Sequence, residues 1–337
     1  MLDYPVFEIA AADFNENGTK DLALTRHHSV VMFKGRGDGT FRQAGRFSVG
    51  SLPSKLLVAD LNRDGDKDLV TSNFDSDNVS VLIGRGDATF RRRVNYRAGD
   101  GASGVDVGKL NGDRKPDLAV TNLFDDDVSI RLGRGDGTFG PKRDRGAAQN
   151  PRDVAIARLN RDRERDLAVA GFRQVAILKG RGDGTFRRGR DVLIGLLDSE
   201  VIATRINRDR ANDLVFSDVS NNWSVYVARG RGNGTFKAPS AYGFDSAPTK
   251  IALADLVGGP RKDLIVETIG YPGGGGNNPG FLYVLRGRRG GFTQQIAQPL
   301  DGRGGRFAIA DLNGDGTRDV AALTHTPVPK IEIFLNH

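Results

Sequence analysis

The sequence contains no cysteine, and this absence excludes several classes of site at once. Without a thiol, the 337-residue chain forms no disulfide, holds no thiolate-bound metal and has no cysteine nucleophile. No apolar run approaches the roughly 18 residues that a membrane-spanning helix needs. The amino end also lacks a basic segment followed by an apolar core, the pattern of a secretory signal. With aromatic residues at only 7% and 45 glycines, the composition is typical of a turn-rich globular protein.

The charge favours contact with anionic groups without indicating nucleic acid. Lysine and arginine total 49 against 42 aspartate and glutamate, a formal net charge of +7. A positive field attracts phosphate, sulfate and carboxylate groups. Nucleic-acid readers, however, concentrate basic residues on one face or helix beside stacking aromatics. Here arginines are spread along the whole chain, so nucleic acid is not an expected partner.

An acidic segment recurs seven times along the chain and organises it. The segment has the form Asp-x-Asn-x-Asp/Asn-Gly-x-x-Asp, between two apolar runs, and successive copies begin 47 to 56 residues apart. Self-similarity at such a period is the mark of a repeat architecture. The copies, called loops one to seven, begin at Asp13, Asp60, Lys109, Arg158, Arg205, Asp255 and Asp311.

A second marker, GRGDGTF or a close variant, follows each of the first six loops. It ends at Phe41, Phe90, Phe139, Phe186, Phe236 and Phe292. Short β-branched runs before and after the markers predict four antiparallel strands in each unit, which is one propeller blade. The sequence therefore predicts an all-β, seven-bladed β-propeller that forms a single domain over residues 1–337. The expected blades cover approximately residues 6–52, 53–101, 102–150, 151–198, 199–247, 248–303 and 304–337, the last closed by residues 1–5.

The two markers together resemble the FG-GAP and VCBS repeats of integrin α-subunit heads, fungal propeller lectins and bacterial surface proteins. The resemblance covers essentially the whole chain and implies a calcium-stabilised propeller. For function it implies a binding or adhesion module, since the family spans adhesion, carbohydrate binding and a few sugar lyases. One departure is that arginine takes the usual asparagine place in the GDG turn, as at Arg36 and Arg85.

Three of the acidic loops offer the ligands that calcium prefers. Ca²⁺ takes six to eight oxygens, which alternate side chains of a tight loop can supply. The alternative is that these loops are Asx-type turns closed by backbone amides and water. The predicted calcium ligands are Asp13, Asn15, Asn17 and Asp21 in loop one, Asp60, Asn62, Asp64 and Asp68 in loop two, and Asp311, Asn313, Asp315 and Asp319 in loop seven.

Loops three, four and five begin with a cation instead of an acid. We expect Lys109, Arg158 and Arg205 to neutralise the remaining carboxylates from the place where calcium would sit, which leaves these loops free of metal. Loop six has Val257 and Gly259 at ligand positions and supplies too few oxygens.

Arg-Gly-Asp occurs in four of the GDG markers and suggests an integrin ligand. Turn chemistry already accounts for its glycine and aspartate, and is the preferred interpretation.

The loops between second and third strands offer a candidate ligand rim. Phe74, Asp75, Phe124 and Asp125 combine rings with carboxylates, as carbohydrate or peptide contacts do, or else Phe74 and Phe124 only cap blade packing. Ring closure would bring His27 and His28 near His325, as a site for a metal or a proton shuttle or as unrelated surface residues.

We therefore expect a non-catalytic module, secreted or at the cell surface, that binds a glycan or protein. The alternatives are a lyase-like enzyme acting on acidic sugars through the histidines, and a surface protein that self-associates into a structural assembly.

Overall fold

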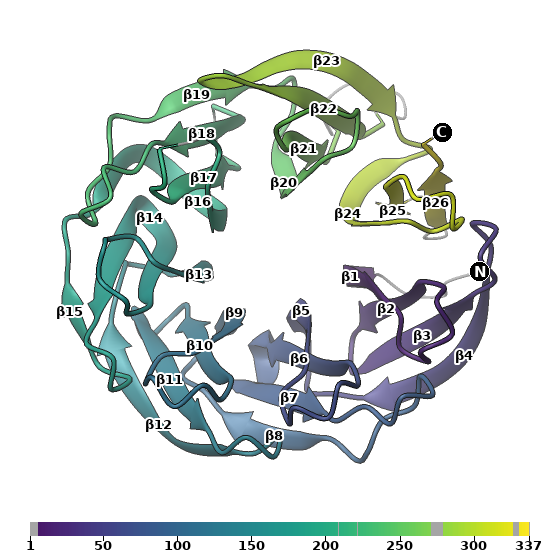
Figure 1. The fold of residues 1–337 in the computed structure, drawn as a ribbon, viewed down its shortest axis with the longest axis horizontal. Coiled ribbons are helices and arrows are strands. Elements are labelled where there is room, and N and C mark those ends of the chain that lie inside the picture. Colours follow the sequence, from purple (N-terminus) through teal and green to yellow (C-terminus); the bar gives the residue numbers. More distant parts are fainter. Residues whose placement is uncertain (1–5, 208, 221, 271–278, 326–329, 337) are drawn as a thin grey trace.

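The protein is an all-β ring in which successive sheets surround one axis (Figure 1). The computed structural model describes residues 6–207, 209–220, 222–270, 279–325 and 330–336. In this part of the chain the only helical element is the single 3₁₀ turn η1 (Phe74–Ser76). No helix of the described ranges is long and apolar enough to span a bilayer.

The first three blades are regular four-stranded antiparallel sheets, with strand order following the chain from the axis outward. Blade 1 contains β1 (Val6–Ala12), β2 (Asp21–Arg26), β3 (Ser29–Gly35) and β4 (Phe41–Ser48). Blade 2 contains β5 (Pro53–Ala59), β6 (Asp68–Asn73), β7 (Asn78–Leu82) and β8 (Val94–Arg97). Blade 3 contains β9 (Ala102–Gly108), β10 (Asp117–Asn122), β11 (Asp127–Gly133) and β12 (Phe139–Gly146).

Blades 4 and 5 are joined by a strand that pairs with both of them. Their elements are β13 (Asp153–Ala157), β14 (Asp166–Gly180), β15 (Phe186–Arg188), β16 (Val192–Thr204), β17 (Asp213–Asp218), β18 (Ser224–Ala228) and β19 (Ser240–Gly243). The long β14 folds back at Arg173, whose φ is 61°, so that the N–H of Gly180 donates to Asp166 Oδ1 at 3.0 Å. β16 pairs first with β14 and then with β17, and so joins the two blades into one seven-stranded sheet.

Blades 6 and 7 complete the ring. Blade 6 contains β20 (Pro248–Ala254), β21 (Asp263–Thr268), β22 (Phe281–Arg288) and β23 (Gly291–Pro299). Blade 7 contains β24 (Arg303–Ala310), β25 (Asp319–His325) and β26 (Lys330–Phe334). Residues 1–5, expected to close the last blade, lie outside the described residues. The arrangement confirms the seven-bladed propeller predicted from the repeats.

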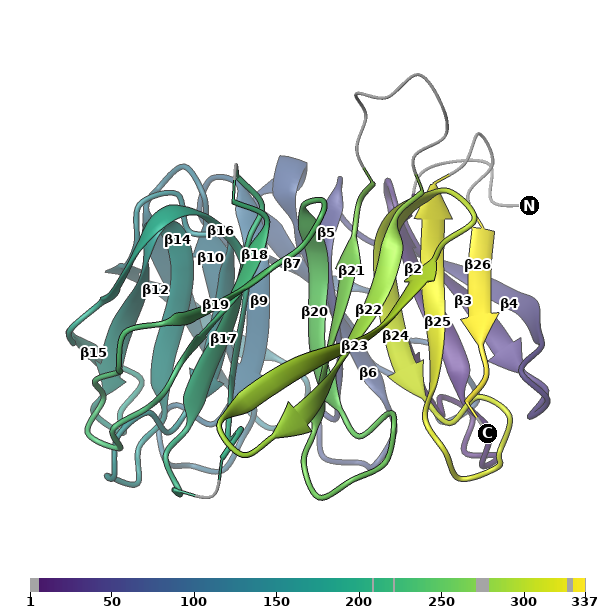
Figure 2. The ribbon, with the colours of Figure 1, turned by 90° about the horizontal axis from the view of Figure 1, so that it is seen from above.

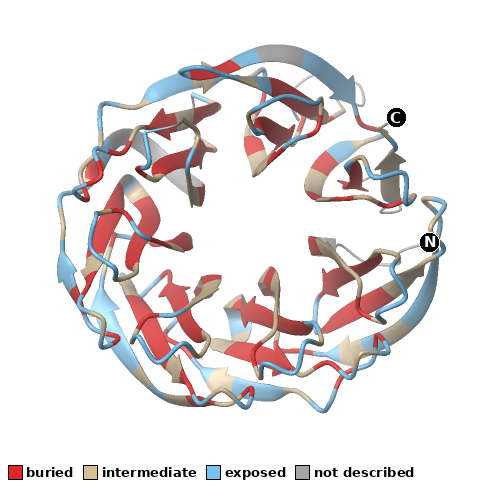
Figure 3. Cartoon of the chain, in the orientation of Figure 1, coloured by how far each residue is buried: buried red, intermediate tan, exposed pale blue. Residues whose placement is uncertain are grey.

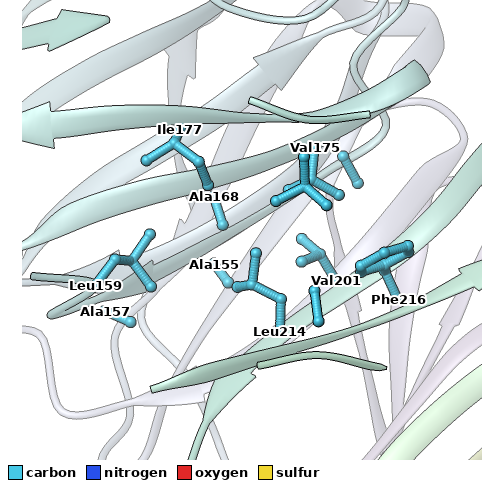
Figure 4. Close-up of a cluster of buried hydrophobic side chains, with 12 residues drawn as sticks. Ala155, Ala157, Leu159, Ala168, Val175, Ile177, Val201, Leu214 and Phe216 are labelled. Atoms are coloured by element: carbon cyan, nitrogen blue, oxygen red, sulfur yellow. The ribbon is translucent and has the colours of Figure 1, made fainter. Parts of the chain in front are cut away.

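The hydrophobic core lies between neighbouring blades. Figure 4 shows one such layer, where Leu159 and Ile177 of blade 4 face Leu214 and Phe216 of blade 5. The ring closes by the same packing, because Leu24 of blade 1 shares a buried cluster with residues of blade 7. Figure 3 shows burial concentrated on inner and middle strands, with exposed residues on outer strands and loops. Blades packed face to face bury both surfaces of each sheet, which is why the second strands are buried throughout.

The propeller has two faces, formed by different sets of connections. Connections between first and second strands, such as that between β24 and β25, lie on the lower edge in Figure 2 and form the acidic-loop face. Antiparallel order places the connections between second and third strands on the opposite edge, here called the rim face.

Candidate functional site

The last aspartate of each acidic loop fastens that loop to the end of the third strand of its blade. In blade 3, Asp117 Oδ2 accepts the N–H of Leu110 at 2.6 Å and Oδ1 accepts the N–H of Gly133 at 2.8 Å. Burial raises the pKa of Asp117, and these two N–H donors oppose the rise. The same pair of bonds recurs in all seven blades, at Asp21, Asp68, Asp117, Asp166, Asp213, Asp263 and Asp319.

The side chains of the predicted calcium ligands also accept hydrogen bonds from backbone N–H groups of their own loops. In loop two, Asp60 accepts the N–H of Arg63 at 2.6 Å and that of Gly65 at 3.2 Å. Asp13 and Asp311 cap loops one and seven in the same way. Each of the remaining ligands accepts an N–H two residues ahead, namely Asn15, Asn17, Asn62, Asp64, Asn313 and Asp315. These are the contacts expected of Asx-type turns.

The donor chemistry of loop two nevertheless suits a divalent cation. Burial raises the pKa of Asp68, and the nearby carboxylates of Asp64 and Asp60 raise it further. A carboxylate oxygen has two lone pairs, so one N–H bond leaves capacity for a metal. Within the described ranges, however, no three histidine, aspartate or glutamate side chains are arranged to hold a metal ion. Calcium in loops one, two and seven therefore stays a prediction.

Among the described residues, no ion pair joins Lys109, Arg158 or Arg205 to a carboxylate. Arg158 Nε instead donates to the carbonyl of Arg163 at 3.1 Å, and the ion-pair partner of Asp113 is Lys115 at 3.9 Å.

The aspartates of the Arg-Gly-Asp tripeptides close tight turns. Asp38 Oδ1 accepts both the N–H and the hydroxyl of Thr40, at 2.9 and 2.6 Å, and these bonds lower the pKa of Asp38. The flanking Gly37 and Gly39 have φ near 80°, which glycine adopts without strain. Asp87, Asp136 and Asp183 make the same two bonds.

The structure brings two of the predicted rim residues into contact. The rings of Phe74 and Phe124, from blades 2 and 3, meet edge to face with centroids 5.7 Å apart. Phe124 is 59% exposed. Asp125 Oδ2 accepts the N–H of Asp100 at 2.8 Å, and the N–H of Asp75 donates to the carbonyl of Ser51. The two loops thus form one aromatic and acidic surface on the rim face.

The histidines divide into two environments. The rings of His27 and His28 lie 6.2 Å apart and line a hollow of about 600 Å³ with Arg26 and Arg46. His325 packs beside Gly305. Burial lowers the pKa of His325, and the charges of Arg303 and Arg306 lower it further.

A buried charge network at the axis was not foreseen from the sequence. Lys55 Nζ of blade 2 lies 3.2 Å from both Asp153 Oδ2 of blade 4 and Glu200 Oε1 of blade 5. Lys250 continues the network at 3.0 Å to Glu200 and to Glu8, whose second oxygen lies 3.5 Å from Arg306 Nε. Three carboxylates thereby balance three cations. This axial charge network consists of Glu8, Lys55, Asp153, Glu200, Lys250 and Arg306.

Burial and pairing act in opposite directions on these groups. Burial alone would raise the pKa of Glu200, but Lys250 and Lys55 hold it well below its usual range. Beside the network, burial raises the pKa of Glu267 to about 8 and that of Asp106 to about 6. The network ties inner strands across the axis and leaves these two carboxyls as its titratable neighbours.

A signal for this network was present in the sequence. Each of its members stands five residues before the first position of an acidic loop. Blade 3 has Gly104 there, and a Cβ atom at Gly104 would lie 2.7 Å from the backbone of Arg152 and Asp153. Glycine is therefore required at the one blade that contributes no charge at this position.

Comparison with known proteins identifies the repeat and the fold. The FG-GAP-like repeat family matches residues 13–71, 60–120 and 109–169, and each match begins at the first position of an acidic loop. No curated protein matches the chain in sequence.

Several solved structures share the fold at low identity. A chain from the crystal structure of BBS1N in complex with ARL6DN, soaked with lead, is 11% identical with a TM-score of 0.72, over 100% of this chain and 94% of that one. A lectin of Agrocybe aegerita that recognises non-reducing terminal N-acetylglucosamine is 18% identical with a TM-score of 0.57, over 87% and 80%. A putative 6-phosphogluconolactonase from Bacteroides uniformis is 11% identical with a TM-score of 0.66, over 88% and 86%. At these identities the likeness shows the fold alone.

Proposed function

Because this chain is an FG-GAP repeat propeller, we propose that it is a non-catalytic binding module whose rim face engages a glycan. The contact of Phe124 with Phe74, between the acidic side chains of two blades, carries the proposal. An exposed ring packed against a second ring offers a fixed apolar surface, because the partner ring restricts its rotation.

The chemistry of this surface matches a sugar. A pyranose presents an apolar face that stacks on an aromatic ring, and its hydroxyl groups donate to carboxylates. Phe124 supplies the ring, while Asp75 and Asp125 lie beside the two rings in sequence and supply the acceptors. Asp75 and Asp125 are both accessible to solvent, so a ligand can reach them without a conformational change of the protein.

Two structural relatives support this type of role for the fold. The Agrocybe aegerita protein is a lectin, and BBS1N was crystallised in complex with another protein. The ligand could accordingly be a protein instead of a glycan, and the experiment distinguishes these two outcomes. The proposal includes calcium in loops one, two and seven as a structural ion, and a location outside the cell or at its surface, where such a module meets glycans.

The experiment compares three proteins on glycan and protein arrays. The native chain should be retained by one class of glycan, and Phe124→Ala should abolish the retention without changing the melting temperature. Leu193→Ala is the matched control, since Leu193 is also apolar and 76% exposed but lies on β16, in blade 4. If only proteins on the array retain the chain, the ligand of the rim face is a protein and not a glycan. Silence on both arrays, or equal loss in both variants, would overturn the proposal.

A further inference from the structure

Loops four and five enclose a hollow of about 400 Å³ on the acidic-loop face. The blades that carry these loops are neighbours in the ring (Figure 1). Asn212 Nδ2 of loop five donates to the carbonyl of Arg158 at 2.9 Å and ties the two loops together. Five arginines and one carboxylate line the hollow, which we call the arginine hollow: Arg158, Arg161, Arg165, Arg205, Arg210 and Asp162.

The side chains that line the arginine hollow carry an excess of positive charge. Five guanidinium groups against one carboxylate leave a formal charge of +4. In the part of the chain that the structure describes, none of the five arginines makes an ion pair. The Oδ1 atom of Asp162 accepts the N–H of Glu164 at 3.0 Å and so faces its own loop. Like charges held this close repel one another, and a bound anion would relieve the repulsion.

Backbone strain occurs in one of these two loops, loop five. The sixth loop position is glycine in loops one, two and seven, where Gly18, Gly65 and Gly316 have φ between 87° and 98°. In loop five this position is Arg210, which retains a φ of 66°. A non-glycine residue in this region costs on the order of 1 kcal/mol. The loop thus keeps a strained backbone while its side chain adds charge to the hollow.

Every loop that lacks the leading acid also lacks this glycine, although loop six keeps Asp255 and has Pro260 at the sixth position. Loops three, four and five begin with a cation and carry an arginine at the sixth position, whereas loops one, two and seven keep both the acid and the glycine. A hollow also lies at the corresponding place between blades 6 and 7, but it is lined by Asp255, Arg318 and mostly uncharged residues. The arginine lining is therefore a property of blades 4 and 5 and not of the repeat.

We propose that the arginine hollow binds an anion bearing a phosphate or sulfate group. The planar guanidinium presents paired N–H donors that match tetrahedral oxyanions, and Arg158 and Arg205 stand at the leading position of adjacent loops. The hollow is within the size range of small-molecule sites. None of the described residues that line it is aromatic, so they offer no stacking surface of the kind that single-stranded nucleic-acid sites use. This site lies on the face opposite the rim and is independent of the proposed function.

The test measures binding of inorganic phosphate, inorganic sulfate, a sugar phosphate and a sulfated sugar by calorimetry at constant ionic strength. The native chain should bind at least one of the four. Arg158→Gln with Arg205→Gln should weaken this binding tenfold or more, and the single change Arg161→Gln should weaken it if the double variant fails to fold. Lys109→Gln is the matched control, because Lys109 begins loop three outside the arginine hollow, and it should bind as the native chain does.

Comparison of the four probes identifies the kind of anion. Tighter binding of the sugar phosphate would assign a phosphate ligand to the hollow, and tighter binding of the sulfated sugar would assign a sulfate ligand. Equal weakening by Lys109→Gln would overturn the proposal, because binding would then follow net charge. Absence of binding to all four probes would overturn it as well. A single-stranded oligonucleotide is a separate, fifth probe. If it binds more tightly than the other four and its binding is insensitive to Arg158 and Arg205, the basic surface would be assigned to nucleic acid and the hollow rejected.

Discussion

Lys55 Nζ and Glu200 Oε1 lie 3.2 Å apart although 145 positions separate the two residues in sequence. Lys55 belongs to the inner strand of blade 2 and Glu200 to that of blade 5, so the pair spans the axis of the ring. Most contacts in a propeller join neighbouring blades. This pair joins blades that are not neighbours, and it does so in a site where the Glu200 side chain is only 6% exposed.

Replacing Lys55 by methionine should destabilise the protein by about 3 kcal/mol or more, since removal of one partner leaves buried charge unpaired. Asp153 and Glu200 would both lose a contact of 3.2 Å. The free energy of unfolding in urea measures the effect.

The control for this change is Lys330→Met. Lys330 pairs with Asp301 on the surface, where the two side chains are 51% and 70% exposed. Exposed pairs contribute little to stability, because solvent screens them. Equal effects of the two substitutions would show that the axial charge network adds nothing beyond ordinary surface pairing.

The second prediction concerns pH and Glu267. Burial raises the pKa of this carboxyl to about 8 in the folded protein, against 4.5 for an unperturbed glutamate. Oε1 accepts the N–H of Gly305 at 2.9 Å, while Oε2 is buried without a hydrogen-bond partner in the described structure and is the place for the proton. The folded state therefore retains a proton that the unfolded chain releases, and the contribution of this group to stability should fall as the pH rises from about 4.5 to 8.

Glu267→Gln isolates this contribution, because the glutamine keeps an acceptor for Gly305 and cannot ionise. The free energy of unfolding of the native chain, minus that of the variant, should decrease between pH 5 and pH 8. Asp106, whose pKa burial raises to about 6, titrates in both proteins and cancels in the difference. A difference that is constant over this range, or that increases with pH, would contradict the assignment.

The fold could be predicted because its information is local and repeated. Each acidic loop and each GDG turn lies within one blade, and seven copies in register fix strand order and blade number. The acidic loop that ends at Asp117 could also be predicted to form a turn. The hydrogen bond from Gly133 to Asp117 could not be predicted, because it depends on where the third strand of the blade ends in space.

The axial charge network was missed because its partners come from blades far apart in sequence. A charge in an inner strand, such as Lys55, interrupts an apolar run without indicating a partner. Only closure of the ring brings Lys55 to Glu200. The rim was partly foreseen, since Phe74 and Phe124 lie in corresponding loops of adjacent repeats, one position apart in register, and adjacent repeats are neighbours in space.

The last prediction tests calcium through the difference between acidic and basic loops. If loops one, two and seven bind Ca²⁺ in the folded state, excess chelator should lower the melting temperature, since an ion at 100 times its dissociation constant stabilises by about 2.7 kcal/mol. The combined change of Asp13, Asp60 and Asp311 to lysine copies the leading cation of loop three and should abolish the response to chelator. Asp113→Asn, in a loop that already begins with Lys109, should leave the response intact. An unchanged melting temperature of the native chain would instead mean that the backbone bonds of Asp60 and its equivalents suffice to hold the loops.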